Sequence, residues 1–118
     1  MSAIAHVTDQ TFDAVIQQQG AGLTIVDFWA PWCAPCRAIA PVLERIASER
    51  TDVRIVKVDS DENLALMGRY GIRGIPTLLF FREGALVEQV VGAVGKDRLD
   101  QRIDELLATP ASPGADPG

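Results

Sequence analysis

The chain has 118 residues, 47% of them hydrophobic, and a formal net charge of −5 at pH 7. This length predicts one domain that buries roughly two-thirds of its unfolded surface in a core of its own. The acidic balance argues against nucleic acid or an anionic membrane as a partner. The first residues lack a secretory signal and no apolar run approaches the ~20 residues of a membrane span, so we expect a cytoplasmic protein.

The N-terminal half alternates between strand and helix periods. Residues 4–7 predict a short strand, followed by a helix that Thr8 is expected to cap. The near-continuous apolar run Leu23–Trp29 is typical of a strand buried on both faces, and a longer helix pattern follows it, which Pro41 should kink. The expected inner face of the first helix is Phe12, Val15, Ile16 and Gln19, ended by Gly20 and Gly22, and that of the longer helix is Cys36, Ile39, Ala40, Leu43 and Ala47.

The C-terminal half continues this alternation. It predicts a strand over Val53–Asp59, a short helix over 63–70 and a hairpin of strands 77–81 and 86–91 around Glu83-Gly84. A final helix follows, with the buried stripe Leu99, Ile103, Leu106 and Leu107. The order β-α-β-α-β-α-β-β-α predicts an α/β fold with a mixed central sheet covered by helices on both faces. We expect the domain to span residues 1–108 and the Pro-, Gly- and Ala-rich residues 109–118 to be a disordered tail.

The two cysteines of the chain, Cys33 and Cys36, lie three positions apart at the predicted strand-to-helix turn. Such a pair closes into a disulfide and reopens, and thereby carries two electrons. A zinc site within one chain needs four ligands, and the only other soft donor is His6. A purely structural disulfide across four residues adds only about 2 kcal/mol. Redox chemistry is therefore the favoured interpretation, and a metal shared between two chains stays a distant alternative.

Five ordered stretches of the sequence carry a family resemblance. They are Phe28-Trp29-Ala30, Trp32-Cys33-Ala34-Pro35-Cys36, Ala40-Pro41, Tyr70-Gly71-Ile72-Arg73-Gly74-Ile75-Pro76-Thr77 and Val91-Gly92-Ala93. In these stretches the chain resembles the thioredoxin family, and only the tail after Ala108 falls outside the match. The resemblance implies a central sheet flanked by helices, with the cysteine pair opening the second helix. It also implies a thiol-disulfide oxidoreductase that reduces protein disulfides.

This resemblance and the chemistry of the side chains together predict catalytic roles. Cys33 is the expected nucleophile, because the start of a helix favours a thiolate by up to about 2 kcal/mol. Cys36, one turn inward, is the expected resolving thiol. Asp27 interrupts a buried strand, so burial should raise its pKa toward neutrality and suit it as the base for Cys36. Lys57 can pair with Asp27 and tune that pKa. The alternatives are an Asp27 at an exposed strand end and a solvated Lys57.

A substrate-binding rim is expected around the cysteines. The resemblance implies a cis peptide bond before Pro76, which presents Ile75 to an extended substrate segment as a short added strand. Gly74 and Gly92 leave room for the backbone of a partner, unless they are ordinary turn glycines. Trp29 is expected to pack beneath an exposed Trp32. The complete predicted rim is Trp32, Ala34, Pro35, Gly74, Ile75, Pro76 and Gly92.

The two residues between the cysteines bear on the direction of electron flow. Ala34-Pro35 places no charged donor beside the thiolate, which favours a reducing pair. Ala34 stands where the family most often has glycine, and this predicts a modest shift in potential or substrate fit. Pro31 stands where the family often has an acidic residue, which leaves the rim less negative.

Recycling of the pair needs an electron source. Because no GxGxxG motif opens a helix after a strand, we expect no bound cofactor and a separate protein as donor. The resemblance implies a flavin-containing, NADPH-dependent thioredoxin reductase as that donor, and disulfides of reductases and peroxidases as electron acceptors. Contacts should be transient, and the protein a monomer. The nearest alternative is a disulfide isomerase or oxidant of the same fold, and the more distant one is a non-redox module that binds a metal between two chains.

Overall fold

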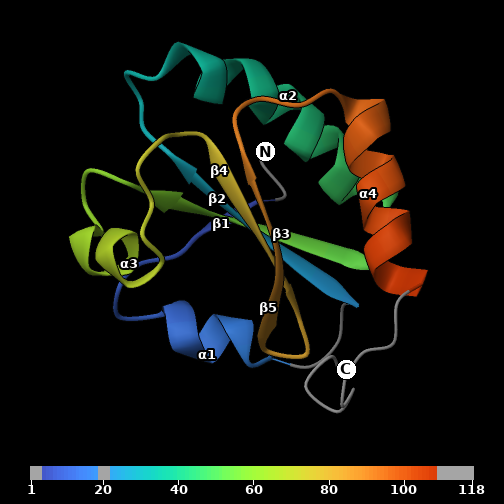
Figure 1. Ribbon diagram of the computed structural model, residues 1–118, viewed down its shortest axis with the longest axis horizontal. Helices are drawn as coiled ribbons and strands as arrows, with labels where there is room; N and C mark the ends of the chain where they lie inside the picture. The colour runs from blue at the N-terminus through green and yellow to red at the C-terminus, as the bar shows by residue number, and fades with distance from the viewer. Residues whose placement is uncertain (1–3, 19–21, 109–118) are drawn as a thin grey trace.

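The computed structural model describes residues 4–18 and 22–108 and folds them around one five-stranded sheet. The strands are β1 (Ala5–His6), β2 (Leu23–Trp29), β3 (Val53–Asp59), β4 (Thr77–Arg82) and β5 (Ala85–Val91). Their order across the sheet is β1-β3-β2-β4-β5 (Figure 1). β3 pairs in parallel with β1 and β2, whereas β4 pairs antiparallel with β2 and β5. This order makes β2 the central strand and leaves β5 at one edge.

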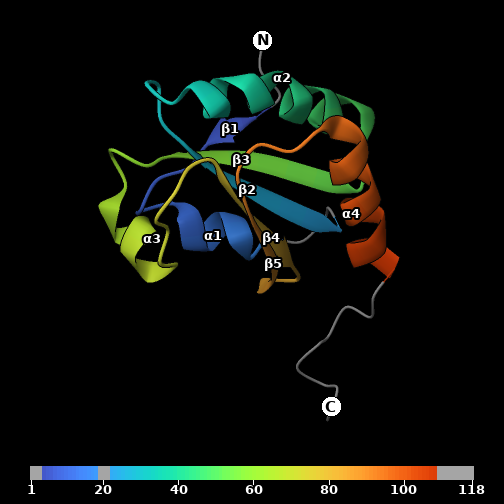
Figure 2. The same cartoon turned by 45° about the horizontal axis from the view of Figure 1, so that its top comes forward.

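In the described part of the chain, four helices cover the sheet: α1 (Phe12–Ile16), α2 (Ala34–Glu49), α3 (Leu64–Arg69) and α4 (Lys96–Ala108). α2 and α4 pack on one face, and α1 and α3 on the other (Figure 2). The core beneath α2 and α4 includes Leu23, Ile25, Ile39, Leu43, Ile46, Ile55, Leu78, Phe80, Leu99 and Ile103. The opposite core includes Phe12, Ile16, Val26, Phe28, Val56, Val58, Leu66, Leu79 and Phe81.

The alternation of side chains along β2 decides where its acidic residue lies. Leu23 and Ile25 belong to the core beneath α2 and α4, whereas Val26 and Phe28 belong to the opposite core. Successive residues of a strand point to opposite faces of the sheet. Asp27 therefore faces α2, in the interior of the molecule.

The element order and the α/β fold predicted from the sequence are confirmed. β2 and β3 have the predicted bounds, because their long apolar runs leave little choice of register or end. The longer helix pattern also forms, with Cys36, Ile39 and Leu43 buried on its inner face. Ile46 completes this face, while Ala40 and Ala47 are only partly buried. Pro41 lies inside α2, and the kink there stays a prediction.

The prediction of the first helix cap was wrong. The residue before α1 is Thr11, and Thr8 lies one turn earlier. The Thr8 carbonyl accepts the N–H groups of Thr11 and Phe12, and the Thr8 N–H donates to Thr11 Oγ1 over 3.0 Å. Thr8 thus begins a turn that precedes the helix. Gln19, Gly20 and the predicted tail 109–118 lie outside the described residues, and the domain boundary at 108 stays a prediction.

Candidate active site

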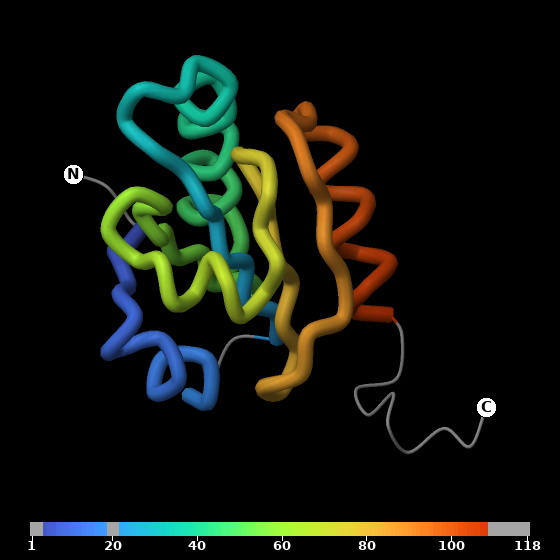
Figure 3. The backbone as a smooth tube through the Cα atoms, turned by 60° about the vertical axis from the view of Figure 1, so that its left-hand side comes forward, coloured from blue at the N-terminus to red at the C-terminus, as the bar shows by residue number. Residues whose placement is uncertain are grey.

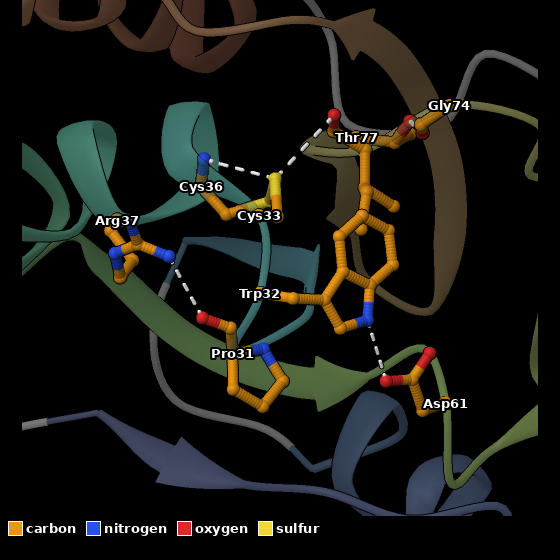
Figure 4. Close-up of a disulfide and its surroundings, with 9 residues drawn as sticks. Pro31, Trp32, Cys33, Cys36, Arg37, Asp61, Gly74 and Thr77 are labelled. Carbon is orange, nitrogen blue, oxygen red and sulfur yellow. Dashed lines mark hydrogen bonds between the residues drawn. A yellow bond between two sulfur atoms is a disulfide. The ribbon is translucent and has the colours of Figure 1, made fainter.

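Cys33 and Cys36 form a disulfide at the start of α2, with their Cα atoms 5.2 Å apart (Figure 4). Cys33 is the N-cap of α2, with extended backbone, and its Sγ accepts the N–H of Cys36 at 3.2 Å. Pro35 lies in the first turn, where a missing N–H costs the helix no hydrogen bond. Both cysteines are almost fully buried, at 4% and 2% exposure. Because the two sulfur atoms are bonded to each other, the structure represents the oxidised form of the chain.

The loop before β4 lies directly against this disulfide. The Ile75–Pro76 peptide bond is cis, as the family resemblance implied, and Cys33 Sγ lies 3.8 Å from the Ile75 carbonyl oxygen. The Ile75 side chain packs on Ala30 and the two cysteines. The carbonyl of Pro76 accepts the N–H of Gly92 at 2.8 Å, and the carbonyl of Gly74 accepts the Thr77 hydroxyl at 2.5 Å. These bonds bring Gly74, Ile75, Pro76 and Gly92 to one side of the cysteines.

Trp32 directly precedes Cys33 and is 66% exposed. Its Nε1 donates to Asp61 Oδ2 at 2.8 Å, which holds the ring across the rim (Figure 4). Arg37 donates to the carbonyl of Pro31 at 2.9 Å and so ties the preceding loop to α2. Sequence reasoning missed Asp61 and Arg37. Asp61 lies in an exposed acidic loop, and nothing in its local pattern indicates that the fold brings this loop to Trp32.

Trp29 lies on the inner side of the site. It is half-buried and packs against Ala30, Cys33 and Cys36. The ammonium of Lys57 lies 5.0 Å from the centroid of its ring, and the ring of His6 lies 5.9 Å away. A cation over an indole ring is a favourable contact. Lys57 is therefore held over Trp29 on the face of the sheet that Asp27 also faces.

Asp27 is fully buried, and neither of its carboxylate oxygens has a hydrogen-bond partner among the described residues. Burial raises the pKa of Asp27 from 3.8 to about 7, and the nearby charge of Lys57 partly opposes this rise. The two residues are direct neighbours in the pairing of β2 with β3. The pKa of Asp27 thus lies near neutrality, where a carboxyl group both accepts and releases a proton.

Within the described residues, no group of three or more His, Cys, Asp or Glu side chains is placed to hold a metal ion. No helix in the same residues is both long and apolar enough to cross a membrane. The disulfide can accept or donate two electrons. The buried carboxyl group of Asp27, which faces the same helix, can accept or release a proton near neutral pH.

Comparison with known proteins identifies the family. The thioredoxin family model matches residues 3–105. This chain belongs to the thioredoxin family. It is 48% identical to thioredoxin 1 of Synechococcus elongatus over 91% of this chain and 100% of that protein. It is 45% identical to thioredoxin of Bacillus subtilis over 89% of this chain and 99% of that protein. A solved structure of a mutant thioredoxin from Halobacterium salinarum superposes with a TM-score of 0.80 at 39% identity, covering 89% of this chain and 93% of that one.

Membership of the thioredoxin family confirms the resemblance stated from the sequence and the fold it implied. The chain is a thiol-disulfide oxidoreductase, a protein-disulfide reductase of the thioredoxin type, and its redox centre is the Cys33–Cys36 pair. Thioredoxins act on disulfide-containing proteins and carry no cofactor themselves.

Proposed function

We propose that Cys33 is the nucleophile and Cys36 the resolving thiol of this reductase. The thiolate of Cys33 attacks one sulfur of a substrate disulfide, forms a mixed disulfide and releases the first substrate thiolate. The thiolate of Cys36 then attacks Cys33 Sγ, releases the second substrate thiolate and closes the Cys33–Cys36 disulfide. Two electrons thus pass from this chain to the substrate. The observation that supports this order is the N-cap position of Cys33, whose Sγ accepts the N–H of Cys36 at 3.2 Å.

We further propose that Asp27 is the base that receives the proton of Cys36. Cys36 is buried on the inner face of α2, and Asp27 faces this helix from β2. With a pKa of about 7, the Asp27 carboxyl group can accept a proton near neutral pH. Lys57 is the tuning residue, since its charge opposes the rise in the pKa of Asp27. Trp29 supports the site through packing, and Pro41 supports it only indirectly, through the kink that it is expected to give α2.

The proposed substrate rim is Trp32, Ala34, Pro35, Gly74, Ile75, Pro76 and Gly92. Its support is the contact of Ile75 with the two cysteines and the exposure of Trp32, Ala34 and Pro35 beside them. An extended substrate segment pairs with Ile75 through its backbone, so that main-chain hydrogen bonds hold substrates of differing sequence. The rim is small, and the resulting contacts are transient.

A separate flavoprotein, thioredoxin reductase, returns electrons from NADPH to the pair in this proposal. Electrons then flow to protein disulfides such as those of reductases and peroxidases, and the chain works as a monomer in the cytoplasm. The uncharged Ala34-Pro35 pair supports this direction, because no cation beside the thiolate stabilises the reduced form. In a mixture of purified thioredoxin reductase, NADPH and a disulfide substrate, we expect the rate of NADPH oxidation to rise with the amount of this protein added.

Trapping the mixed disulfide tests the order of attack. With Cys36→Ser, a peptide containing one internal disulfide should become covalently attached to Cys33 and remain so until a reductant is added. With Cys33→Ser the same peptide should stay free, and the double serine variant provides the control for non-specific attachment. Mass spectrometry of the intact adducts measures each outcome. Attachment to Cys33→Ser, with none to Cys36→Ser, would reverse the two roles.

The redox equilibrium of the pair tests its direction. We would titrate the wild-type protein in dithiothreitol and glutathione buffers and follow the fluorescence of Trp29 and Trp32, which flank the disulfide. A midpoint more reducing than the glutathione pool is expected of a cytoplasmic reductant. A midpoint at or above that pool would argue for an oxidant or isomerase instead.

A further inference from the structure

A groove of about 800 Å³ lies between β5 and α4, at the edge of the sheet. Figure 3 shows the two elements side by side, with β5 as the last strand. Val90, Val94 and Leu99 give the groove its apolar lining. Its charged side chains are those of Glu88, Arg98, Arg102 and Glu105. None of the roles assigned above uses this groove. Its volume lies within the range of pockets that bind ligands.

The groove is continuous with the substrate rim. Val91, which lines it, is 63% exposed and directly precedes Gly92, whose N–H donates to the Pro76 carbonyl at 2.8 Å. A Cβ placed on Gly74 would lie 3.7 Å from Cγ1 of Val91. A chain that leaves the cysteines past Gly74 therefore meets Val91 and then the groove.

The charges of the groove are unevenly satisfied. Arg102 donates to both carboxylate oxygens of Glu88, at 2.9 and 2.8 Å, and to Glu105 at 2.9 Å. These three side chains form one cluster of two carboxylates and one guanidinium, which leaves the cluster one negative charge in excess. Arg98 is exposed, and among the described residues no carboxylate pairs with it. Arg98 thus makes no direct ion pair among the described residues, although the charges of the groove lining balance as a whole, with Arg98 and Arg102 against Glu88 and Glu105.

The stability of α4 does not account for Arg98. The residue lies in the first turn of the helix, where the helix dipole disfavours a cation. An acidic group brought by a partner would relieve this unfavourable interaction with the helix dipole.

We propose that the groove receives the part of a substrate chain that flanks its reactive cysteine, and that Arg98 binds an acidic side chain of this segment. The proposal rests on the thiol chemistry proposed above, which brings the substrate to Cys33. A polypeptide fits better than a small molecule, because the groove continues the rim through Gly92 and Val91. An extended chain advances about 3.3 Å per residue, so a few residues beyond the reactive cysteine can follow this path. Since the chain as a whole carries a net charge of −5, Arg98 supplies a local attraction where the overall field repels acidic partners.

Two matched peptides test this proposal. Each contains one cysteine, bound as a mixed disulfide to a chromogenic aromatic thiol, and they differ only in having aspartates or asparagines on both sides of the cysteine. Reduced protein, freed of other reductants, supplies two electrons, and the products are the peptide thiol, the aromatic thiol and the oxidised protein. Attack on the peptide sulfur is favoured because the aromatic thiolate is the better leaving group. We expect the aspartate peptide to react roughly two- to fivefold faster than the asparagine peptide, as for an exposed ion pair.

Charge-matched variants separate Arg98 from the overall field. Arg98→Glu should abolish or invert the preference for the aspartate peptide, and Arg98→Gln should give an intermediate ratio. Arg45→Glu changes the net charge equally on an exposed part of α2 and should preserve the preference. A wild-type protein that does not distinguish the peptides, or an Arg98→Glu variant with the wild-type ratio, would overturn the role of the groove alone. Failure of both peptides to react would overturn the thiol chemistry, and the groove proposal with it.

Discussion

Asp27 is the residue at which stability and its proposed role as a base conflict most directly. A carboxyl group in the middle of the central strand, without a hydrogen-bond partner among the described residues, is costly once it ionises. The structure tolerates this cost because the group is protonated over much of the acidic range, with a pKa of about 7. The same burial that destabilises the ionised form makes the group a proton acceptor near neutral pH.

The cost of burying Asp27 depends on pH. The native state of the oxidised protein binds the Asp27 proton up to about pH 7, whereas the unfolded chain releases it near the ordinary pKa of 3.8. Stability contributed by this group is therefore present at low pH and lost as the pH rises from about 4 to about 7, by up to roughly 4 kcal/mol. Asp27→Asn should remove this loss, so that it stabilises the protein at about pH 8.5 far more than at about pH 4. Urea unfolding of both proteins at the two pH values measures the effect, and an equal effect at both would contradict it.

The ammonium of Lys57 acts on the pKa of Asp27. Its charge lowers the pKa of Asp27, against the larger effect of burial. Lys57→Met should therefore move the pKa of Asp27 above 7. The carboxyl carbon of Asp27, followed by NMR across pH in the oxidised protein, reports this value directly. Lys96→Met is the control, because Lys96 pairs with Glu49 and Asp100 on the outside of α2 and α4. An unchanged or lower value in Lys57→Met would show that this ammonium does not act on Asp27.

Sequence reasoning located single residues well where their neighbours constrained them. Asp27 was found because an acidic residue interrupts an apolar strand, and the two cysteines because no others occur. The contact of Trp32 with Asp61 was not predictable in the same way. The two residues are 29 positions apart, and only the tertiary fold brings the loop after β3 to the rim. Arg98 likewise resembles any exposed helical arginine until the groove beside it is known.

At the scale of elements, Arg50 connects three segments at the end of α2. It caps this helix and donates to Asp52 just before β3, at 3.0 Å, and to Asp100 and Asp104 on α4, at 3.3 and 2.6 Å. Its side chain is only 18% exposed, so solvent screens these pairs less than an ordinary surface pair. The connection fixes α4 beside α2, and with it the side of the groove that α4 provides.

Arg50→Met should lower the free energy of unfolding by about 1–2 kcal/mol, because three carboxylates then face one another without their common cation. The loss should shrink in high salt, which screens the remaining repulsion. Arg45→Met is the matched control: its single pair with Glu49 is 66% and 46% exposed, and its removal should cost at most about 0.5 kcal/mol. Urea unfolding at low and high salt provides the measurement. Equal losses for both arginines would mean that the connection adds nothing beyond one surface pair.

The elements themselves were predictable to the degree that burial imposed a period. β2 and β3 combine long apolar runs with central positions, and their bounds coincide with the predicted ones. α1 has only five residues, and its start depends on hydrogen bonds within the turn from Thr8 to Thr11 that no hydrophobic pattern records. The edge strand β5 was found, but the groove beside it depends on how far α4 lies from it, which periodicity does not determine.

At the scale of the whole molecule, both cores close within the described residues. Leu99, Ile103 and Leu106 of α4 complete the core beneath α2, and α4 ends at Ala108. The C-terminal residues 109–118 add no large apolar side chain, since they consist of Thr, Pro, Ala, Ser, Gly and Asp. Burial of apolar surface is the main source of stability, so little of it depends on this segment.

A chain ending at Ala108 should therefore keep the free energy of unfolding of the full chain within about 0.5 kcal/mol, and the same rate of disulfide reduction. Removal of residues 104–118 is the contrasting variant, because it deletes Leu106 together with Asp104, one of the carboxylates bound to Arg50. It should lose at least about 2 kcal/mol from the core contact alone. Urea unfolding and single-turnover reduction of a peptide disulfide measure both variants. If the chain ending at Ala108 lost stability or rate comparable to the longer deletion, the domain would extend beyond residue 108 and the predicted boundary would be wrong.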